Sequence, residues 1–204
     1  MLTLPILRKM LLNAAVELKA NSTYLCELDS VAGDGDHGIT IGRMADVMKT
    51  MTEEDQPNTM HDLLDELGDA FMGINGGSAG PLWGTIFSGM AEGIEDQAEL
   101  TELEFRKMFV QAKEDFMDIS KAQVGDKTMV DALYPALDTA IAAHGTLKEI
   151  MDAAAAAAVQ GAESTSQLVA KFGRAKNMGE RSLGTKDPGA VSIAILFSAM
   201  AQAV

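Results

Sequence analysis

Residues 146–160 read TLKEIMDAAAAAAVQ and give the clearest local indication of secondary structure in the chain. Thr146 followed by Glu149 has the spacing of a capping box, in which two side chains satisfy free backbone N–H groups at a helix start. The alanine run Ala153–Ala158 favours helix. Because apolar residues flank this run, we expect a closely packed helix rather than a low-complexity segment.

The rest of the chain has the same helical character. Apolar residues recur at three- and four-residue spacing, and alternating strand patterns are absent. Helix start signals recur as well, including two prolines in first turns, Pro5 and Pro188. The expected helices cover about 5–26, 39–51, 60–72, 81–95, 102–118, 128–143, 147 onward and 188 to the C-terminus. We therefore predict an all-α fold, an eight-helix antiparallel up-and-down bundle or barrel.

Composition limits the class of protein. The 204 residues suit a single domain covering 1–204. The formal net charge of −14 argues against binding a nucleic-acid backbone. A single cysteine, Cys26, excludes an internal disulfide and favours a reducing compartment. With no apolar run of about 18 residues and no signal-peptide pattern, we expect a cytoplasmic protein that does not enter a membrane.

The glycines concentrate in GDGDHG (33–38), GINGGSAG (73–80), VGDK (124–127) and GERSLGTKDPG (179–189). These segments follow the first, third, fifth and seventh expected helices. In an up-and-down bundle such alternate loops share one end. Glycine lets a backbone approach a ligand closely, so we predict a ligand site in the loops at one end of the bundle.

Asp29, Asp34 and Asp36 fall within eight residues around the first of these loops. Three carboxylates this close repel one another unless a cation lies between them. Oxygen ligands, completed by water and phosphate, are what Mg²⁺ prefers. If one carboxylate bridges two ions, three suffice for a pair. The simpler alternative is that the aspartates only cap the next helix in solvent.

Other readings of the loops fit less well. Residues 33–38 match GxGxxG, but that dinucleotide fingerprint follows a strand, and the preceding segment looks helical. An EF-hand starting at Asp34 would need glycine in place of Ile39 and glutamate in place of Ala45. Residues 125–128 lack the glycine that precedes the lysine of a P-loop. His37 reads most simply as a loop histidine without a role, and no serine or cysteine nucleophile with a histidine partner is evident.

Four segments together resemble the ADP-binding L subunits of dihydroxyacetone kinase, the DhaL family: LDSVAGDGDHG (28–38), GGSAGPLWG (76–84), VGDKTMVDAL (124–133) and GERSLGTKDPGA (179–190). They occur in the order of the family, over essentially the full length. The resemblance implies an eight-helix barrel with a nucleotide bound at one end. The helix count made from the residues alone agrees with it.

The resemblance also implies the residues of the site. Asp29, Asp34 and Asp36 would coordinate two Mg²⁺ ions that bridge the phosphates of ADP or ATP. The nucleotide would contact His37, Gly38, Ile39, Thr40, Ser78, Ala79, Ser120, Thr128, Met129, Arg174, Asp187, Pro188 and Gly189. The match is looser at Ser120, where family members also carry glycine, and Pro81 and Trp83 receive no role.

In the family, a K subunit holds the ketone, and phosphoryl transfer takes place where the K and L subunits meet. ADP stays bound in the three-subunit enzymes, and a phosphohistidine on an M subunit of the phosphotransferase system rephosphorylates it. The resemblance thus implies a kinase subunit that is active only with its partners and has no catalytic residue of its own beyond the metal site. The absence of a K-like region in these 204 residues favours the three-subunit arrangement.

Several alternatives stay open from the sequence. An ATP-dependent dihydroxyacetone or erythrulose kinase would use the same metal site with exchangeable ATP. A non-enzymatic helical module that binds divalent cations would leave three of the glycine-rich loops unexplained. A regulatory module would present its nucleotide state to a transcription regulator, and a homodimer is a further arrangement to consider.

Overall fold

The computed structural model describes residues 2–54 and 57–204. Most of these residues are helical. In chain order the elements are β1 Leu2–Thr3, α1 Leu4–Ala20, α2 Ser22–Ser30, α3 His37–Glu53, α4 Met60–Met72, α5 Ala79–Glu92, β2 Glu99–Leu100, α6 Glu102–Ile119, α7 Val130–Ala142, α8 Leu147–Ser164, the 3-10 segments η1 Thr165–Gln167 and η2 Arg174–Ser182, and α9 Pro188–Gln202.

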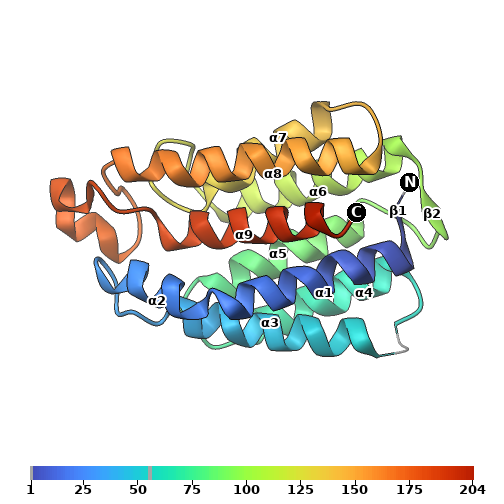
Figure 1. Cartoon of the computed structure of the whole chain (residues 1–204), viewed down its shortest axis with the longest axis horizontal. Coiled ribbons are helices and arrows are strands. Elements are labelled where there is room, and N and C mark those ends of the chain that lie inside the picture. Colours follow the sequence, from blue (N-terminus) through green and yellow to red (C-terminus); the bar gives the residue numbers. More distant parts are fainter. Residues whose placement is uncertain (1, 55–56) are drawn as a thin grey trace.

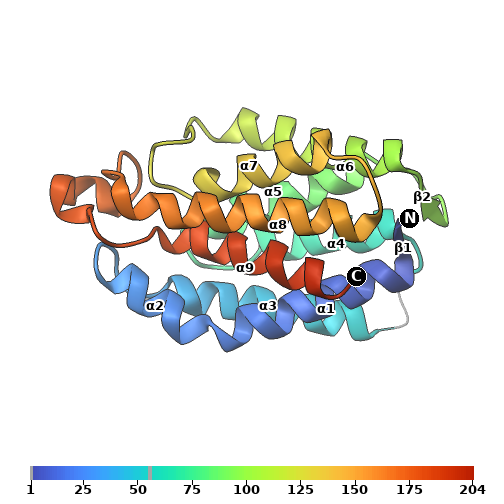
Figure 2. The ribbon, with the colours of Figure 1, turned by 45° about the horizontal axis from the view of Figure 1, so that its top comes forward.

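The long helices form a closed ring in which sequence neighbours run in opposite directions (Figures 1 and 2). Starting from α1, the order around the ring is α9, α8, α7, α6, α5, α4 and α3, and α3 returns to α1. Helix α2 extends beyond α1 and packs on α3. The all-α bundle or barrel predicted from the sequence is therefore confirmed.

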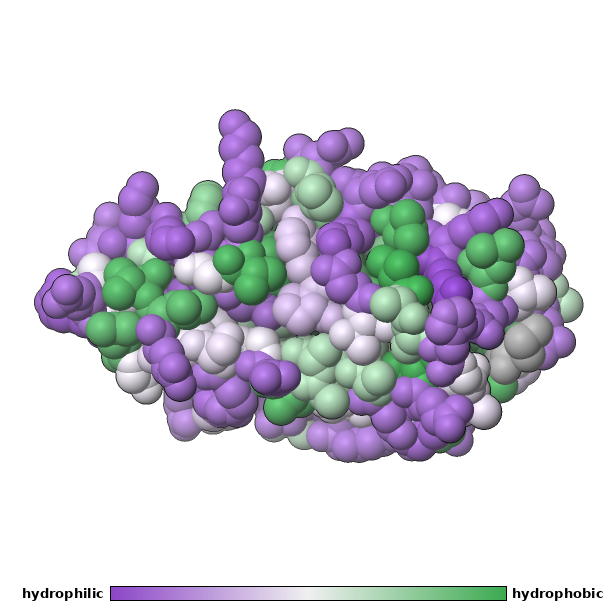
Figure 3. All heavy atoms as spheres, turned by 90° about the horizontal axis from the view of Figure 1, so that it is seen from above, coloured by the Kyte–Doolittle hydropathy of each residue, from purple (hydrophilic) through white to green (hydrophobic). Residues whose placement is uncertain are grey.

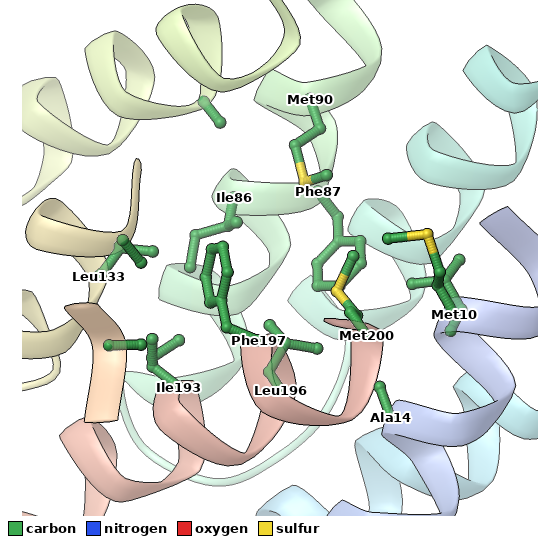
Figure 4. Close-up of a cluster of buried hydrophobic side chains, with 14 of the residues drawn as sticks. Met10, Ala14, Ile86, Phe87, Met90, Leu133, Ile193, Leu196, Phe197 and Met200 are labelled. Atoms are coloured by element: carbon green, nitrogen blue, oxygen red, sulfur yellow. The ribbon is translucent and has the colours of Figure 1, made fainter. Parts of the chain in front are cut away.

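The interior of the ring is filled with aliphatic and aromatic side chains, which form one hydrophobic cluster. Figure 4 shows Phe197 and Met200 of α9 on the side that faces Ile86 and Phe87 of α5, and all four side chains are buried. Each fully buried apolar side chain contributes about 1.5–3 kcal/mol relative to exposure. The stability of the bundle thus comes mainly from this core and less from the loops at its ends.

The first expected helix is two helices. Helix α1 ends before Asn21, whose Nδ2 donates to the carbonyl of Glu17 (2.8 Å), and α2 then continues to Ser30 rather than stopping near Cys26. Asparagine side chains compete with the main chain for hydrogen bonds and so disfavour a helix interior. Within residues 2–54 and 57–204 there are nine α-helices, so the predicted count of eight holds only if α1 and α2 are taken together.

Four expected helix starts occur at the expected residues. Thr59 accepts a hydrogen bond from the backbone N–H of Asp62, three residues along. Thr101 and Thr146 each form both halves of a capping box, and Asp187 caps α9. Replacing such an N-cap with alanine typically costs about 1 kcal/mol. The residues next to each helix start therefore determine where these four helices begin.

The two ends of the bundle differ. At one end β1 pairs antiparallel with β2, with Leu2 opposite Leu100, a short ladder that the sequence did not predict. At the other end lie the loops 31–36, 73–78, 120–129 and 165–187, which contain the glycine-rich segments (Figure 1). Among the described helices, none combines the length and the apolar character needed to cross a bilayer.

Candidate functional site

A cavity of about 440 Å³ lies at the glycine-rich end of the bundle, and all four of its loops border it. The first residues of α3, α5 and α9, which are His37, Ala79 and Pro188, also line this cavity. Free N–H groups and the positive end of the helix dipole make a helix N-terminus favourable for an anion. The starts of α3 and α5 are therefore suited to phosphate oxygens, whereas the carboxylate of Asp187 caps the start of α9.

Most of the residues expected in the site border this cavity. They are Asp29, Asp34, Asp36, His37, Ser78, Ala79, Ser120, Thr128, Met129, Arg174, Asp187, Pro188 and Gly189. Three expected residues in the first turn of α3 do not: Gly38 packs against α2, the side chain of Ile39 points to solvent, and Thr40 is buried against Gly76.

Asp29, Asp34 and Asp36 come together at the cavity. One carboxylate oxygen from each lies within 4.8 Å of the other two. Asp29 lies in α2, beyond the residue near 26 at which the sequence predicted the helix to end. Asp36 directly precedes α3. Gly33 lets the backbone of the loop pass close to the Asp29 carboxylate, because a Cβ on residue 33 would lie 2.2 Å from Asp29 Oδ1. Three carboxylate oxygens in this arrangement are a donor set that fits Mg²⁺.

Helix capping explains the position of only one of the three aspartates. Asp29 Oδ2 accepts hydrogen bonds from the backbone N–H groups of Asp36 (3.0 Å) and His37 (3.3 Å), so Asp29 does cap α3. Asp36 makes no side-chain cap, although it occupies the N-cap position. Asp34 pairs with Arg174 instead. Capping thus does not explain why Asp34 and Asp36 lie beside Asp29.

Charges around the three aspartates act in opposite directions. The hydrogen bond from Arg174 lowers the pKa of Asp34. Burial, followed by the negative charge of Asp34, raises the pKa of Asp36. The same hydrogen bond raises the pKa of Arg174, which keeps the guanidinium charged. One arginine therefore offsets part of the negative charge of the group.

His37 connects α3 to α9. Its Nε2 lies 3.2 Å from Ser192 Oγ, and that hydroxyl donates to the carbonyl of Gly189 (2.8 Å). Since the hydroxyl has one proton, the ring nitrogen donates and the hydroxyl accepts. Burial lowers the pKa of His37, which favours the neutral ring. His37 thus has a defined contact across the site that its loop position in the sequence did not reveal.

A second wall of the cavity is formed where the loops before α7 and α9 meet. A Cβ on Gly189 would lie 3.2 Å from the Cβ of Met129, so the loop before α7 contacts the first turn of α9. Asp187 Oδ2 accepts from the backbone N–H of Ala190 (2.7 Å) and caps α9. Burial raises the pKa of Asp187 to about 7.

Several lining residues had no assigned role in the sequence, among them Trp83, Phe172 and Lys127. Trp83 is fully buried, as expected for a core residue, and Phe172 is 41% exposed. Lys127 is buried, and its Nζ donates to the carbonyls of Thr165 and Thr185. A lysine in a polar loop looks solvated in the sequence, because its burial depends on segments far along the chain.

A second trio of potential ligands, His61, Asp62 and Asp96, has ligand atoms within 4.8 Å of one another. None of the three residues borders the cavity. Asp62 lies in the first turn of α4, where the helix dipole favours a carboxylate without any metal. This trio therefore provides control positions rather than a second candidate site.

The DAK2 domain family matches residues 31–202, which include all four glycine-rich segments. The chain belongs to the DAK2 domain family. This membership confirms the resemblance that the four motifs indicated.

Similar proteins include subunits and longer enzymes. The ADP-binding subunit DhaL of PEP-dependent dihydroxyacetone kinase 1 from Listeria innocua is 35% identical over 185 residues, which are 91% of this chain and 89% of that protein. DhaL of Escherichia coli is 31% identical over 189 residues, 89% of this chain and 88% of that protein. The L-erythrulose kinase of Pectobacterium atrosepticum is 37% identical over 93% of this chain, but the chain spans only 33% of it.

The dihydroxyacetone kinase of C. freundii has a similar fold. Its native crystal structure superposes with a TM-score of 0.73 and 29% identity, over 97% of this chain and 34% of that chain. The same kinase in complex with AMP-PNP and Mg²⁺ gives a TM-score of 0.73, 28% identity and 97% coverage of this chain. The chain spans about a third of that enzyme.

Proposed function

We propose that this DAK2 domain protein is the nucleotide-carrying L subunit of a dihydroxyacetone-type kinase, built as one domain covering residues 1–204. The observation that carries the proposal is the convergence of Asp29, Asp34 and Asp36 with the N-termini of α3 and α5 around one cavity. Carboxylates suit a cation and helix N-termini suit a phosphate. The ADP-binding relatives and the AMP-PNP and Mg²⁺ complex of the C. freundii kinase support the same choice of ligand.

Asp29, Asp34 and Asp36 would hold two Mg²⁺ ions. Bound Mg²⁺ neutralises charge on the phosphates, and phosphoryl transfer depends mainly on such neutralisation and on positioning. Asp29 is held in orientation by its two bonds to the start of α3. Arg174 adds a planar guanidinium, which suits phosphate oxygens, at the same group of carboxylates.

The cavity volume of about 440 Å³ lies in the range of small-molecule sites, about 300–1,000 Å³. The proposed contacts on the phosphate side are His37, Ser78 and Ala79, which border the cavity, whereas Gly38, Ile39 and Thr40 lie outside its wall. Those proposed on the nucleoside side are Ser120, Thr128, Met129, Asp187, Pro188 and Gly189. Met129 is apolar and nearly buried beside Gly189 in the first turn of α9, which suits contact with a base.

The ketone would be held by a K subunit that docks at this end of the bundle, and an M subunit would rephosphorylate ADP. Segment 168–186 supports a protein partner here, because it contains five of the 16 Lys and Arg residues of this acidic chain and one acidic residue, Glu180. Val169, Phe172 and Leu183 in this segment are 37–44% exposed. Figure 3 shows green apolar groups among purple ones at the end that carries η2.

The L subunit of an ATP-dependent dihydroxyacetone or erythrulose kinase is the second candidate, because a relative named L-erythrulose kinase is 37% identical. In both enzymes the ketose would lie on another part of the assembly, so the same nucleotide site would serve either substrate. A non-enzymatic cation-binding module is less well supported, since it does not explain why three more glycine-rich loops border the cavity.

Isothermal titration calorimetry tests the metal assignment. We expect the protein to bind ADP only when Mg²⁺ is present. Asp34→Asn and Asp36→Asn should each lose more than about a hundredfold in affinity, since even a supporting partner of a metal ligand contributes about 10–100-fold. Asp96→Asn, in the second trio, is the matched control and should bind normally. Unchanged affinity in both site variants would contradict the assignment.

A coupled assay tests the partner arrangement. With K and M subunits and a phosphoenolpyruvate-driven relay, the protein should support phosphorylation of dihydroxyacetone over many turnovers. ATP alone should support it poorly if ADP is a resident carrier. Rapid multiple turnover on ATP alone would contradict the resident-ADP mechanism and favour the second candidate, while the metal site would stand.

A further inference from the structure

Lys127 lies in the loop between α6 and α7 and is unusual in two respects. The residue is only 4% exposed, whereas lysine is almost never fully buried without a partner. Its φ is +59°, and within residues 2–54 and 57–204 no other non-glycine residue has a positive φ. Such a backbone conformation is uncommon for a residue with a Cβ and points to a constraint from its surroundings.

The ammonium group of Lys127 connects two loops at the glycine-rich end. Nζ donates to the carbonyl of Thr165 at the start of η1 (2.6 Å) and to the carbonyl of Thr185 shortly before α9. Thr165 Oγ1 accepts in turn from the backbone N–H of Asp187 (2.9 Å). Lys127 directly precedes residues 128–129, which border the cavity. One side chain therefore joins the loop before α7 to the loop before α9.

The charges around Lys127 support this role. Burial lowers the pKa of the ammonium, while the charges of Asp187 and Asp131 raise it. Asp131 is buried and accepts from the backbone N–H groups of Gly125 (2.6 Å) and Thr128 (2.7 Å), which shapes the loop before α7. Two carboxylates, each of which organises one of the two loops, thus favour the charged form of Lys127.

We propose that Lys127 is a positioning residue of the nucleotide site, whose buried ammonium holds residues 128–129 against residues 187–189 and so shapes the wall that receives the nucleoside. This inference rests on the proposed nucleotide-binding function. Lys127 acts through the main chain of these loops and not through the three aspartates. Its loss should therefore weaken contacts to the nucleoside more than contacts to the phosphates.

Lys127→Met tests the proposal, because methionine nearly keeps the length of the side chain and removes the ammonium. The probes are Mg·ADP and Mg·pyrophosphate, which carries the two phosphates without the nucleoside, both measured by calorimetry. We expect affinity for Mg·ADP to fall roughly tenfold or more, with a change of less than about twofold for Mg·pyrophosphate. An unchanged affinity for Mg·ADP, or an equal loss for both probes, would overturn the proposal.

Two further variants complete the experiment. Lys148→Met makes the same charge change at an exposed residue that pairs with Asp152 in α8, and it should bind both probes normally. Lys127→Gln keeps a polar side chain but removes the charge and is too short to bond both carbonyls, so it serves if Lys127→Met does not fold. It should show the same selective loss for Mg·ADP, and normal Mg·ADP binding by folded Lys127→Gln would also overturn the proposal.

The wild-type protein separates this inference from the function on which it rests. If the wild type binds neither probe, the nucleotide function itself is wrong. If the wild type binds Mg·ADP and folded Lys127→Met binds it equally well, only the role of Lys127 is wrong.

Discussion

Arg174 of η2 forms an ion pair with Asp34, one of the three carboxylates that meet at the cavity. The two side chains are 68% and 43% exposed, so solvent screens their attraction. The pair joins the loop before α3 to the segment before α9. It also places a guanidinium on a carboxylate that a divalent cation would need, so the arginine and the cation compete for Asp34.

Arg174→Gln should leave the free energy of unfolding unchanged within the error of urea denaturation, because exposed ion pairs contribute little. Binding of Mn²⁺ alone, as a probe for the divalent cation, should become tighter because the competing guanidinium is gone. Binding of Mg·ADP should become weaker because a proposed phosphate contact is lost. Titrations followed by electron paramagnetic resonance, with and without ADP, measure both effects, and weaker binding of Mn²⁺ alone would contradict the competition.

Gly33→Ala tests whether Asp29 is a metal ligand. The added Cβ would lie 2.2 Å from Asp29 Oδ1, so the carboxylate must turn away. Turning Asp29 away also breaks its hydrogen bonds to the start of α3, so we expect the free energy of unfolding to fall by about 1 kcal/mol. The displaced carboxylate would no longer meet Asp34 and Asp36, and Mg·ADP affinity should fall at least about tenfold. Full affinity in calorimetry would show that Asp29 is not a ligand.

Gly38 and Gly42 form a matched pair in α3. A Cβ at Gly38 would lie 1.8 Å from the carbonyl oxygen of Ser22, whereas at Gly42 the nearest atoms are 3.7 Å away. Gly38→Ala should force α3 away from α2 and destabilise the protein by about 1–3 kcal/mol. Gly42→Ala should stabilise it by up to about 1 kcal/mol, since alanine is the better helix former. Urea denaturation compares them, and a Gly38→Ala protein of wild-type stability would rule out this close packing of α2 on α3.

Asp187 should make stability depend on pH. Burial, with the charge of Asp131 acting in the same direction, raises its pKa from 3.8 to about 7, although the Ala190 N–H and Lys127 lower it. Between these two pH values the unfolded chain loses the proton while the folded protein keeps it. The contribution of Asp187 to the free energy of unfolding is therefore fully present below about pH 4 and is lost as the pH rises through about 7. Each pKa unit corresponds to about 1.4 kcal/mol, so the decline is on the order of a few kcal/mol.

Asp187→Asn should remove this part of the pH dependence, because asparagine is also a good N-cap but does not titrate. The unfolding free energy of the wild type, minus that of the variant, should decrease as the pH rises from about 4 to about 7. Urea denaturation of both proteins across this range measures the difference. A difference that does not vary with pH would mean that the pKa of Asp187 is not raised.

Helix starts could be predicted from the sequence because caps are local. Thr59, Thr101, Thr146 and Asp187 each bond to a backbone N–H three residues along, so the relevant partners are adjacent in the chain. The sequence also predicted that the glycine-rich loops lie at one end of the bundle, because successive helices alternate in direction. The break at Asn21 was missed because the apolar spacing continues through it.

Other parts of the site depend on contacts between distant segments. Nothing in the local sequence places Arg174 beside Asp34 or buries Lys127 against Thr165. The segment η2 has too few apolar residues for a core helix, and β1 and β2 are two residues each, too short for an alternating pattern. These features arise when the loops pack together, so they became visible only in the folded chain.

Native mass spectrometry of the protein in Mg²⁺ and excess ADP tests the nucleotide site most directly. We predict a species with one ADP and two Mg²⁺ ions per chain, which loses all three when the metal is chelated. Asp34→Asn should appear as the bare chain under the same conditions. A wild-type spectrum with only the bare chain, despite excess ADP and Mg²⁺, would contradict the proposed site.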